Sequence, residues 1–166
     1  MKSGIAVVAA VLLALGFAGF ANAAEMESKQ EQALILAVMN VNKVVLLLKS
    51  KGTIGPASLK GVMASWKGDE GSCFTEASTQ YLKDMVLGKE VTVKWDSHGT
   101  TNKDGHLLVY ISYEGIDINA ELLRRGPGWV PRMFPADRKE AYLAFEQEAR
   151  EAEPKRGLWG SCPKEF

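Results

Sequence analysis

Residues 91–126 constrain the fold of this chain most, because their hydrophobic pattern changes its period within one short stretch. Apolar residues alternate with polar ones over residues 91–95, and a period of two is typical of a half-buried strand. After a polar loop, residues 107–113 form an apolar, β-branched run of strand length. The stretch therefore predicts two strands joined by a loop.

A turn and a short helix follow these two strands. Glu114 and Gly115 form the predicted turn, because glycine tolerates a positive φ. After a short strand, either Asp117 or Asn119 can cap a helix that Gly126 ends in the left-handed conformation. A helix this close to a strand pair predicts a domain that mixes both kinds of element.

The rest of the chain supplies further strands first and further helices last. Apolar runs predict three more strands, and apolar residues at helical spacing predict two more helices. The expected strands cover residues 33–38, 44–48 and 57–64, with turns over 40–43 and 49–55, and the expected helices cover residues 74–86 and 136–153. This order predicts the α+β class.

The N-terminus has the pattern of a secretory signal peptide. Lys2 precedes an apolar run over residues 4–20, and small residues at 21–23 form an A-x-A cleavage site. The alternative, a membrane-spanning anchor, fits less well, since the run is short and no basic flank follows it. We expect a signal peptide over 1–23, a polar leader over 24–32 and a single domain over 33–166. The protein is then exported, periplasmic or secreted, with no membrane attachment after cleavage.

The charge balance bears on the class of partner. Twenty basic and twenty acidic side chains leave no formal net charge. Proteins that bind nucleic acid usually carry a basic surplus, since neutralising phosphates drives their affinity. Nucleic acid is thus a possible partner that the net charge does not support.

Three segments carry a resemblance to a known family. Residues 102–111 read NKDGHLLVYI, residues 118–126 read INAELLRRG and residues 142–159 read YLAFEQEAREAEPKRGLW. They resemble the segments DxYGRxLAYV, VNxxLVRxG and Y…F…AExEAR…GLW of the staphylococcal nuclease (thermonuclease) family. The resemblance spans about residues 33–162 and implies a five-stranded Greek-key barrel of the oligonucleotide/oligosaccharide-binding type, packed with three helices.

The resemblance also implies a site, and this chain departs from it. Active members use calcium, two arginines and a glutamate to stabilise charge on phosphate and to activate water. The implied arginine positions hold Ser58 and His106, and the glutamate position holds Trp66. The calcium positions hold Asn42 and Met63, where a neutral amide and a soft thioether replace carboxylates. We therefore predict no catalytic residues and no metal at these positions.

The two cysteines of the chain are Cys73 and Cys162. An even count in an exported protein favours a disulfide. Two separate buried thiols are the alternative, and a zinc site would need more ligands than these cysteines and two histidines readily supply. In the family that the chain resembles, a cysteine before the first long helix often accompanies one just after GLW, which implies that these two are paired.

Five side chains are candidates for ligand contact, each with a plainer alternative. Trp66 would place an indole in the implied pocket, and Phe134 lies near a position where the family stacks a nucleotide. The other candidates are polar or basic: Lys103, His106 and Arg132. The plainer alternative is a core or rim role for the aromatics and solvated surface for the basic residues. A metal pair of His98 and His106 is a further alternative to two solvated loop histidines.

The resulting hypothesis is an exported nuclease-like domain that is catalytically inactive and acts as a binding module for an unidentified ligand or protein, with no cofactor. The alternative is an active calcium-dependent phosphodiesterase that cuts DNA or RNA from a relocated active site. Asp69 and Glu70 are acidic residues that such a site would use. Calcium is a cofactor only under this alternative.

Overall fold

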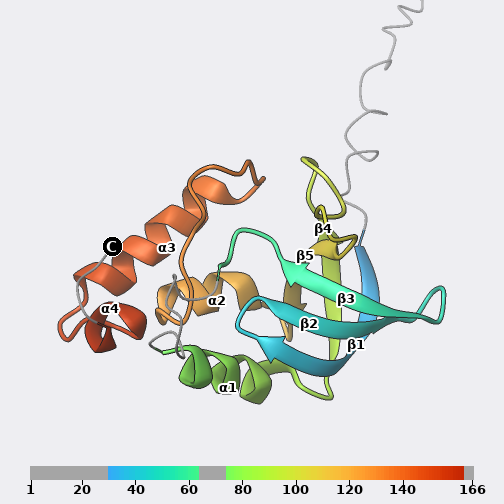
Figure 1. The fold of residues 1–166 in the computed structure, drawn as a ribbon, viewed down its shortest axis with the longest axis horizontal. Coiled ribbons are helices and arrows are strands. Elements are labelled where there is room, and N and C mark those ends of the chain that lie inside the picture. Colours follow the sequence, from blue (N-terminus) through green and yellow to red (C-terminus); the bar gives the residue numbers. More distant parts are fainter. Residues whose placement is uncertain (1–29, 64–73, 163–166) are drawn as a thin grey trace, which may run out of the picture.

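The computed structural model describes residues 30–63 and 74–162. Five strands form a closed barrel, and helices lie beside it and beneath it (Figure 1). The α+β class and the barrel packed with helices are as the sequence and its resemblance predicted. The elements are β1 (Gln30–Asn40), β2 (Lys43–Leu48), β3 (Thr53–Leu59), α1 (Thr75–Val86), β4 (Glu90–Trp95), β5 (Leu107–Tyr113), β6 (Ile116–Asp117), α2 (Ile118–Arg124), α3 (Lys139–Glu151) and α4 (Leu158–Ser161).

The barrel closes through one parallel contact. Neighbouring strands follow the order β3-β2-β1-β4-β5-β6 and pair antiparallel, whereas β3 and β5 pair parallel. The parallel ladder is short and joins Ala57 to Leu107, Ser58 to Leu108 and Leu59 to Val109. Closure leaves fewer unpaired strand edges, and it brings the end of β3 beside the start of β5.

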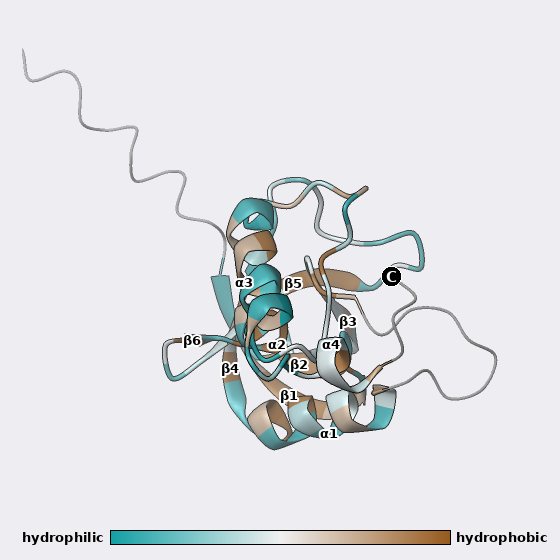
Figure 2. Ribbon diagram, turned by 90° about the vertical axis from the view of Figure 1, so that its left-hand side faces the viewer, coloured by the Kyte–Doolittle hydropathy of each residue, from teal (hydrophilic) through white to brown (hydrophobic). Residues whose placement is uncertain are grey.

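The core lies inside the barrel and under the helices. Alternate side chains of β2 and β4 are buried, as a period of two requires, whereas β3 and β5 each bury three consecutive residues where they meet the helices or each other. Apolar residues concentrate on the strands, and α3 is mostly hydrophilic (Figure 2). Helix α1 contacts β1, and α2 contacts both β5 and α3. In α1 the buried side chains are Ser78, Leu82 and Val86, and the Ser78 hydroxyl donates to the Pro127 carbonyl at 2.9 Å. Ala77, an apolar residue of the same helix, is exposed.

The stretch that most constrained the prediction folds as expected. Strand β5 has the predicted bounds. Of the two predicted caps, Asp117 begins α2, since its carboxylate accepts a hydrogen bond from the Ala120 amide at 3.0 Å. Gly126 has φ +85°, and a Cβ there would lie 2.4 Å from the Arg156 carbonyl oxygen. Only glycine, which has no Cβ, allows this close approach. The segment before α4 therefore packs directly against the end of α2.

The expected boundaries of β1, β3 and the last long helix are wrong. Strand β1 begins at Gln30 instead of residue 33, because residues 30–32 pair with β4. Strand β3 covers Thr53–Leu59 instead of residues 57–64, and a turn with Gly61 at positive φ follows it. It begins early because Gly55 and Pro56 pair with β2, on a stretch of β3 that does not pair with β5. A proline is tolerated on such an edge.

The last long helix also begins later than expected, at Lys139 instead of residue 136. The Asp137 amide donates to the Asp96 carboxylate instead of entering a helical turn. Within the residues that the structure describes, no helix is long and apolar enough to cross a membrane. The predicted signal peptide and the first residues of the predicted leader, up to residue 29, lie outside the described residues.

Candidate functional site

The two implied calcium positions lie in direct contact. Asn42 lies in the tight turn between β1 and β2, where its amide N–H donates to the Asn40 side-chain oxygen at 3.0 Å. Its side-chain Nδ2 donates to the Val62 carbonyl at 3.1 Å and lies 3.7 Å from the Met63 Sδ. The structure therefore brings Asn42 and Met63 together, and the amide group of Asn42 is turned toward neutral acceptors.

The two implied arginine positions flank the parallel ladder. Ser58 is nearly buried in β3 and pairs with Lys43 on one side and Leu108 on the other. His106 is partly buried and precedes β5 by one residue. We call Asn42, Ser58, Met63 and His106 the implied nuclease site, since the ladder and the turn bring them to one end of the barrel. None of the four has a carboxylate or a guanidinium group.

The other predicted contacts are spread out. Trp66 and Cys73 lie outside the described residues, so the Trp66 role and the Cys73–Cys162 disulfide stay predictions. Lys103 is exposed, and the Phe134 side chain is 62% exposed. Arg132 is already engaged, because its guanidinium group donates to both oxygens of Glu146, at 2.7 and 3.0 Å, and to the Val130 carbonyl at 2.8 Å. A ligand at Arg132 would compete with a buried carboxylate.

A second polar cluster centres on Asp96, the residue directly after β4. Its side chain is fully buried. One oxygen accepts hydrogen bonds from the Tyr110 hydroxyl and the Asp137 amide, and the other accepts the His98 amide at 2.8 Å. The Lys60 Nζ lies 3.5 Å from the same carboxylate. Four donors thus fix one acidic group inside the fold.

These contacts shift two ionisation equilibria in opposite directions. Burial by itself would raise the pKa of Asp96, but the hydrogen bonds from Tyr110 and two amides, with the charge of Lys60, outweigh it and lower that pKa. Burial and the neighbouring Asp96 raise the pKa of Tyr110. At neutral pH the pair is therefore a carboxylate that accepts from a neutral phenol.

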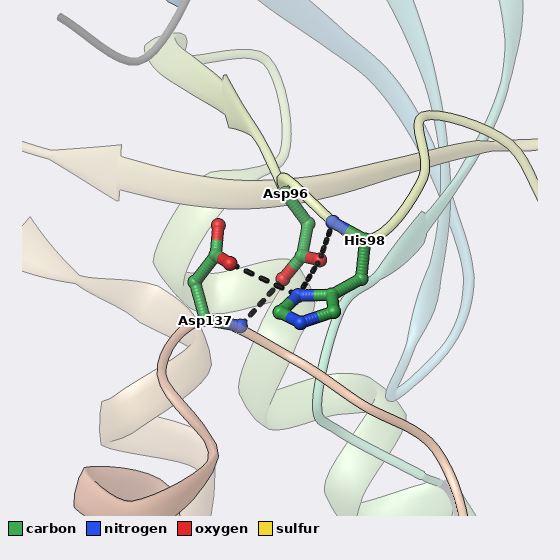
Figure 3. A group of neighbouring side chains, drawn as sticks. All are labelled: Asp96, His98 and Asp137. Carbon is green, nitrogen blue, oxygen red and sulfur yellow. Dashed lines mark hydrogen bonds and ion pairs between the residues drawn. The ribbon is translucent and has the colours of Figure 1, made fainter. Parts of the chain in front are cut away.

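His98 and Asp137 complete this cluster from two loops (Figure 3). The His98 Nδ1 lies 3.2 Å from an Asp96 oxygen and 3.0 Å from an Asp137 oxygen. We call Asp96, His98 and Asp137 the loop triad. The donor atoms of the triad lie within 4.8 Å of one another, and His106 is not a member. The partners of His98 are therefore two carboxylates instead of the second histidine.

Comparison with known proteins decides the family. The family model described as staphylococcal nuclease homologue matches residues 58–161. The chain belongs to the staphylococcal nuclease homologue family. An uncharacterized protein from Bacillus anthracis is 33% identical over 81 residues, which cover 48% of this chain. The same alignment covers 37% of that relative, so this chain spans about a third of the relative's length.

Sequence reasoning missed the loop triad of this family member. The sequence pairs His98 only with His106 and marks neither Asp96 nor Asp137 as a ligand. One local signal existed, because Asp96 and His98 are two residues apart directly after a predicted strand. No local signal points to Asp137, which joins them only through the tertiary fold.

Proposed function

We propose that this nuclease-family domain is exported and acts by binding a ligand, without phosphodiesterase activity. The observation that carries the proposal is the contact between Asn42 and Met63. Calcium is held by hard, mostly anionic oxygen ligands. The neutral amide of Asn42, whose Nδ2 faces Val62 and Met63, and the thioether of Met63 offer no anionic oxygen at the two positions where the family places carboxylates.

The missing guanidinium groups support the same proposal. Charge builds on the phosphate oxygens during attack, and positively charged or hydrogen-bonding groups aimed at them supply much of the rate. Ser58 carries no charge and is nearly buried between two strands. His106 has one nitrogen, Nδ1, that is buried and without a hydrogen-bond partner among the described residues. Neither side chain can hold a phosphate in the bidentate manner of arginine.

A binding role needs groups that are free to contact a partner. Among the predicted contacts that the structure describes, Lys103 is exposed and Phe134 is mostly exposed, so these two are available to a ligand. An exposed aromatic ring can stack on a base or another planar group, and an exposed lysine can add affinity for an anion. We infer that the ligand contacts Lys103 or Phe134 on the exposed loops instead of entering the implied nuclease site.

The experiment is a cleavage assay with purified protein on single-stranded DNA and RNA, with and without calcium. We expect no cleavage above the uncatalysed background in either condition. Calcium-dependent cleavage that is abolished by His106→Ala would contradict the proposal and favour the calcium-dependent phosphodiesterase. Export has a separate test, since N-terminal sequencing of the protein recovered from a secreting host should begin near Ala24.

A further inference from the structure

We propose that the loop triad binds one divalent transition-metal ion, with zinc as the test ion. The proposal does not depend on the absence of nuclease activity, because the triad shares no residue with the implied nuclease site. It rests on the convergence of one imidazole nitrogen and two carboxylates from two loops.

The spacing of the donor atoms suits a small tetrahedral ion. Zinc bonds nitrogen and oxygen ligands at about 2.0–2.2 Å, so neighbouring ligand atoms of a tetrahedral site lie about 3.3–3.5 Å apart. The His98 Nδ1 lies 3.0 Å from one carboxylate oxygen and 3.2 Å from the other. Small side-chain movements that lengthen these two distances by a few tenths of an ångström would therefore make room for an ion between the three side chains.

Both carboxylates are held in place by the opposite loop. The Asp137 amide donates to Asp96, and in return the Ser97 amide donates to an Asp137 oxygen at 2.8 Å. The Ser97 hydroxyl contacts the other Asp137 oxygen, and Tyr110 holds Asp96. Hydrogen bonds of this kind orient metal ligands in known sites and raise their affinity.

The charge of the triad favours a cation. It has two carboxylates, and among the described residues the cation paired with them is the Lys60 ammonium, which lies near Asp96. The two carboxylates outnumber this one ammonium, and uncompensated negative charge beside a buried residue is costly. A divalent ion would offset that surplus.

The ligand set also selects the class of ion. Imidazole suits zinc and its first-row neighbours, whereas calcium and magnesium prefer oxygen ligands throughout. The side chains of His98 and Asp137 are 45% and 36% exposed, so an ion has a path from solvent and a place for bound water. Three protein ligands with a fourth, open position is the arrangement of zinc sites that also bind water or a ligand.

The test is calorimetric titration of untagged protein with zinc chloride, together with two variants of the exposed ligands, His98→Ala and Asp137→Asn. We expect one zinc ion per chain, and we expect each variant to bind it at least about tenfold more weakly. His106→Ala is the matched control, because this histidine lies outside the triad, and its affinity should equal that of the unaltered protein. Asp96 is left unchanged, since it also holds Tyr110 and the Asp137 loop.

Cobalt gives a second readout that does not depend on calorimetry. A cobalt ion held in a tetrahedral site by these ligands should give a visible absorption band that is absent in His98→Ala. Circular dichroism of each variant establishes that it is folded before titration. Absence of stoichiometric zinc binding by the folded, unaltered protein would overturn the proposal. It would also be overturned if His98→Ala and Asp137→Asn both bound zinc as tightly as the unaltered protein. Displacement of zinc by an equal concentration of calcium would contradict the assigned class of ion.

Discussion

Two polar regions of this domain differ in the burial and the contacts of their side chains. Around α2 and α3, Asn119 and Glu146 are buried, and most of their hydrogen bonds join segments that are far apart in the sequence. In the implied nuclease site, Asn42 and Met63 are neutral side chains that contact each other at a turn. The residues that support this fold are therefore not the residues at the positions of phosphodiester chemistry, so the fold can be kept when the residues for that chemistry are replaced.

The largest effect is expected at Glu146, in the first of these regions. Its side chain is 1% exposed and accepts from Arg132, Arg150 and the Val130 amide. Glu146→Ala leaves these donors without their acceptor. Hydrogen bonds to a charged group contribute about 1.5–3 kcal/mol each, so losing several of them should cost about 3–5 kcal/mol. We expect a loss of this size in the free energy of unfolding, measured by urea denaturation.

Glu148→Ala is the matched control for Glu146. Glu148 lies two residues further along the same helix, is half exposed and pairs with Arg124 at 3.3 Å. Exposed pairs contribute little, so this variant should lose less than about 1 kcal/mol. Equal losses at the two positions would contradict the role assigned to Glu146.

A smaller loss of stability is expected at Asn119, whose side chain is hydrogen-bonded both to β5 and to the turn after β3. Its oxygen accepts the Ile111 amide at 3.0 Å, and its Nδ2 donates to the Lys60 and Val109 carbonyls at 2.9 and 3.2 Å. Asn119→Ala leaves buried groups unsatisfied, at about 1–3 kcal/mol in the free energy of unfolding.

Asn102→Ala is the comparison for Asn119. The Asn102 oxygen also accepts two amides, those of Asp104 and His106, but in a solvent-facing turn where water can replace it. Its urea midpoint should shift less than that of Asn119→Ala. A larger shift for Asn102→Ala would mean that burial does not determine how much stability is lost when an asparagine side chain is removed.

The smallest effect on stability is expected in the implied nuclease site. Asn42→Ala removes one side-chain hydrogen bond to Val62 and a weak contact to Met63 at the edge of the barrel. A single partly exposed hydrogen bond contributes about 0.5–1.5 kcal/mol. Thermal unfolding should therefore place this variant within a few degrees of the unaltered protein. A loss as large as that at Glu146 would remove the contrast between the two regions.

Local sequence signals predicted the fold well where they were strong. Alternation and β-branching gave the bounds of β5, and cap and glycine chemistry gave the start and end of α2. They failed where tertiary contacts override local preference. Pro56 is tolerated in β3 because it lies on a free edge, and Glu146 takes an inward place in α3 because two arginines and an amide satisfy it.

The site was less predictable than the fold. The pairing of Asn42 with Met63 was implied only by resemblance, and the fold shows these two side chains in contact. The loop triad was not foreseen, because its members come from segments about 40 residues apart that no sequence period relates. The triad depends on the hydrogen bond from the Asp137 amide to the Asp96 carboxylate, which forms only in the folded protein.

The central claim is that this member of the nuclease family does not cut phosphodiesters with calcium. Its most direct test is calcium titration of the purified protein by calorimetry, with single-stranded DNA cleavage followed in the same samples. We predict no stoichiometric calcium site of micromolar affinity and no cleavage. A one-to-one calcium site that Asn42→Ala abolishes, accompanied by cleavage, would contradict the claim.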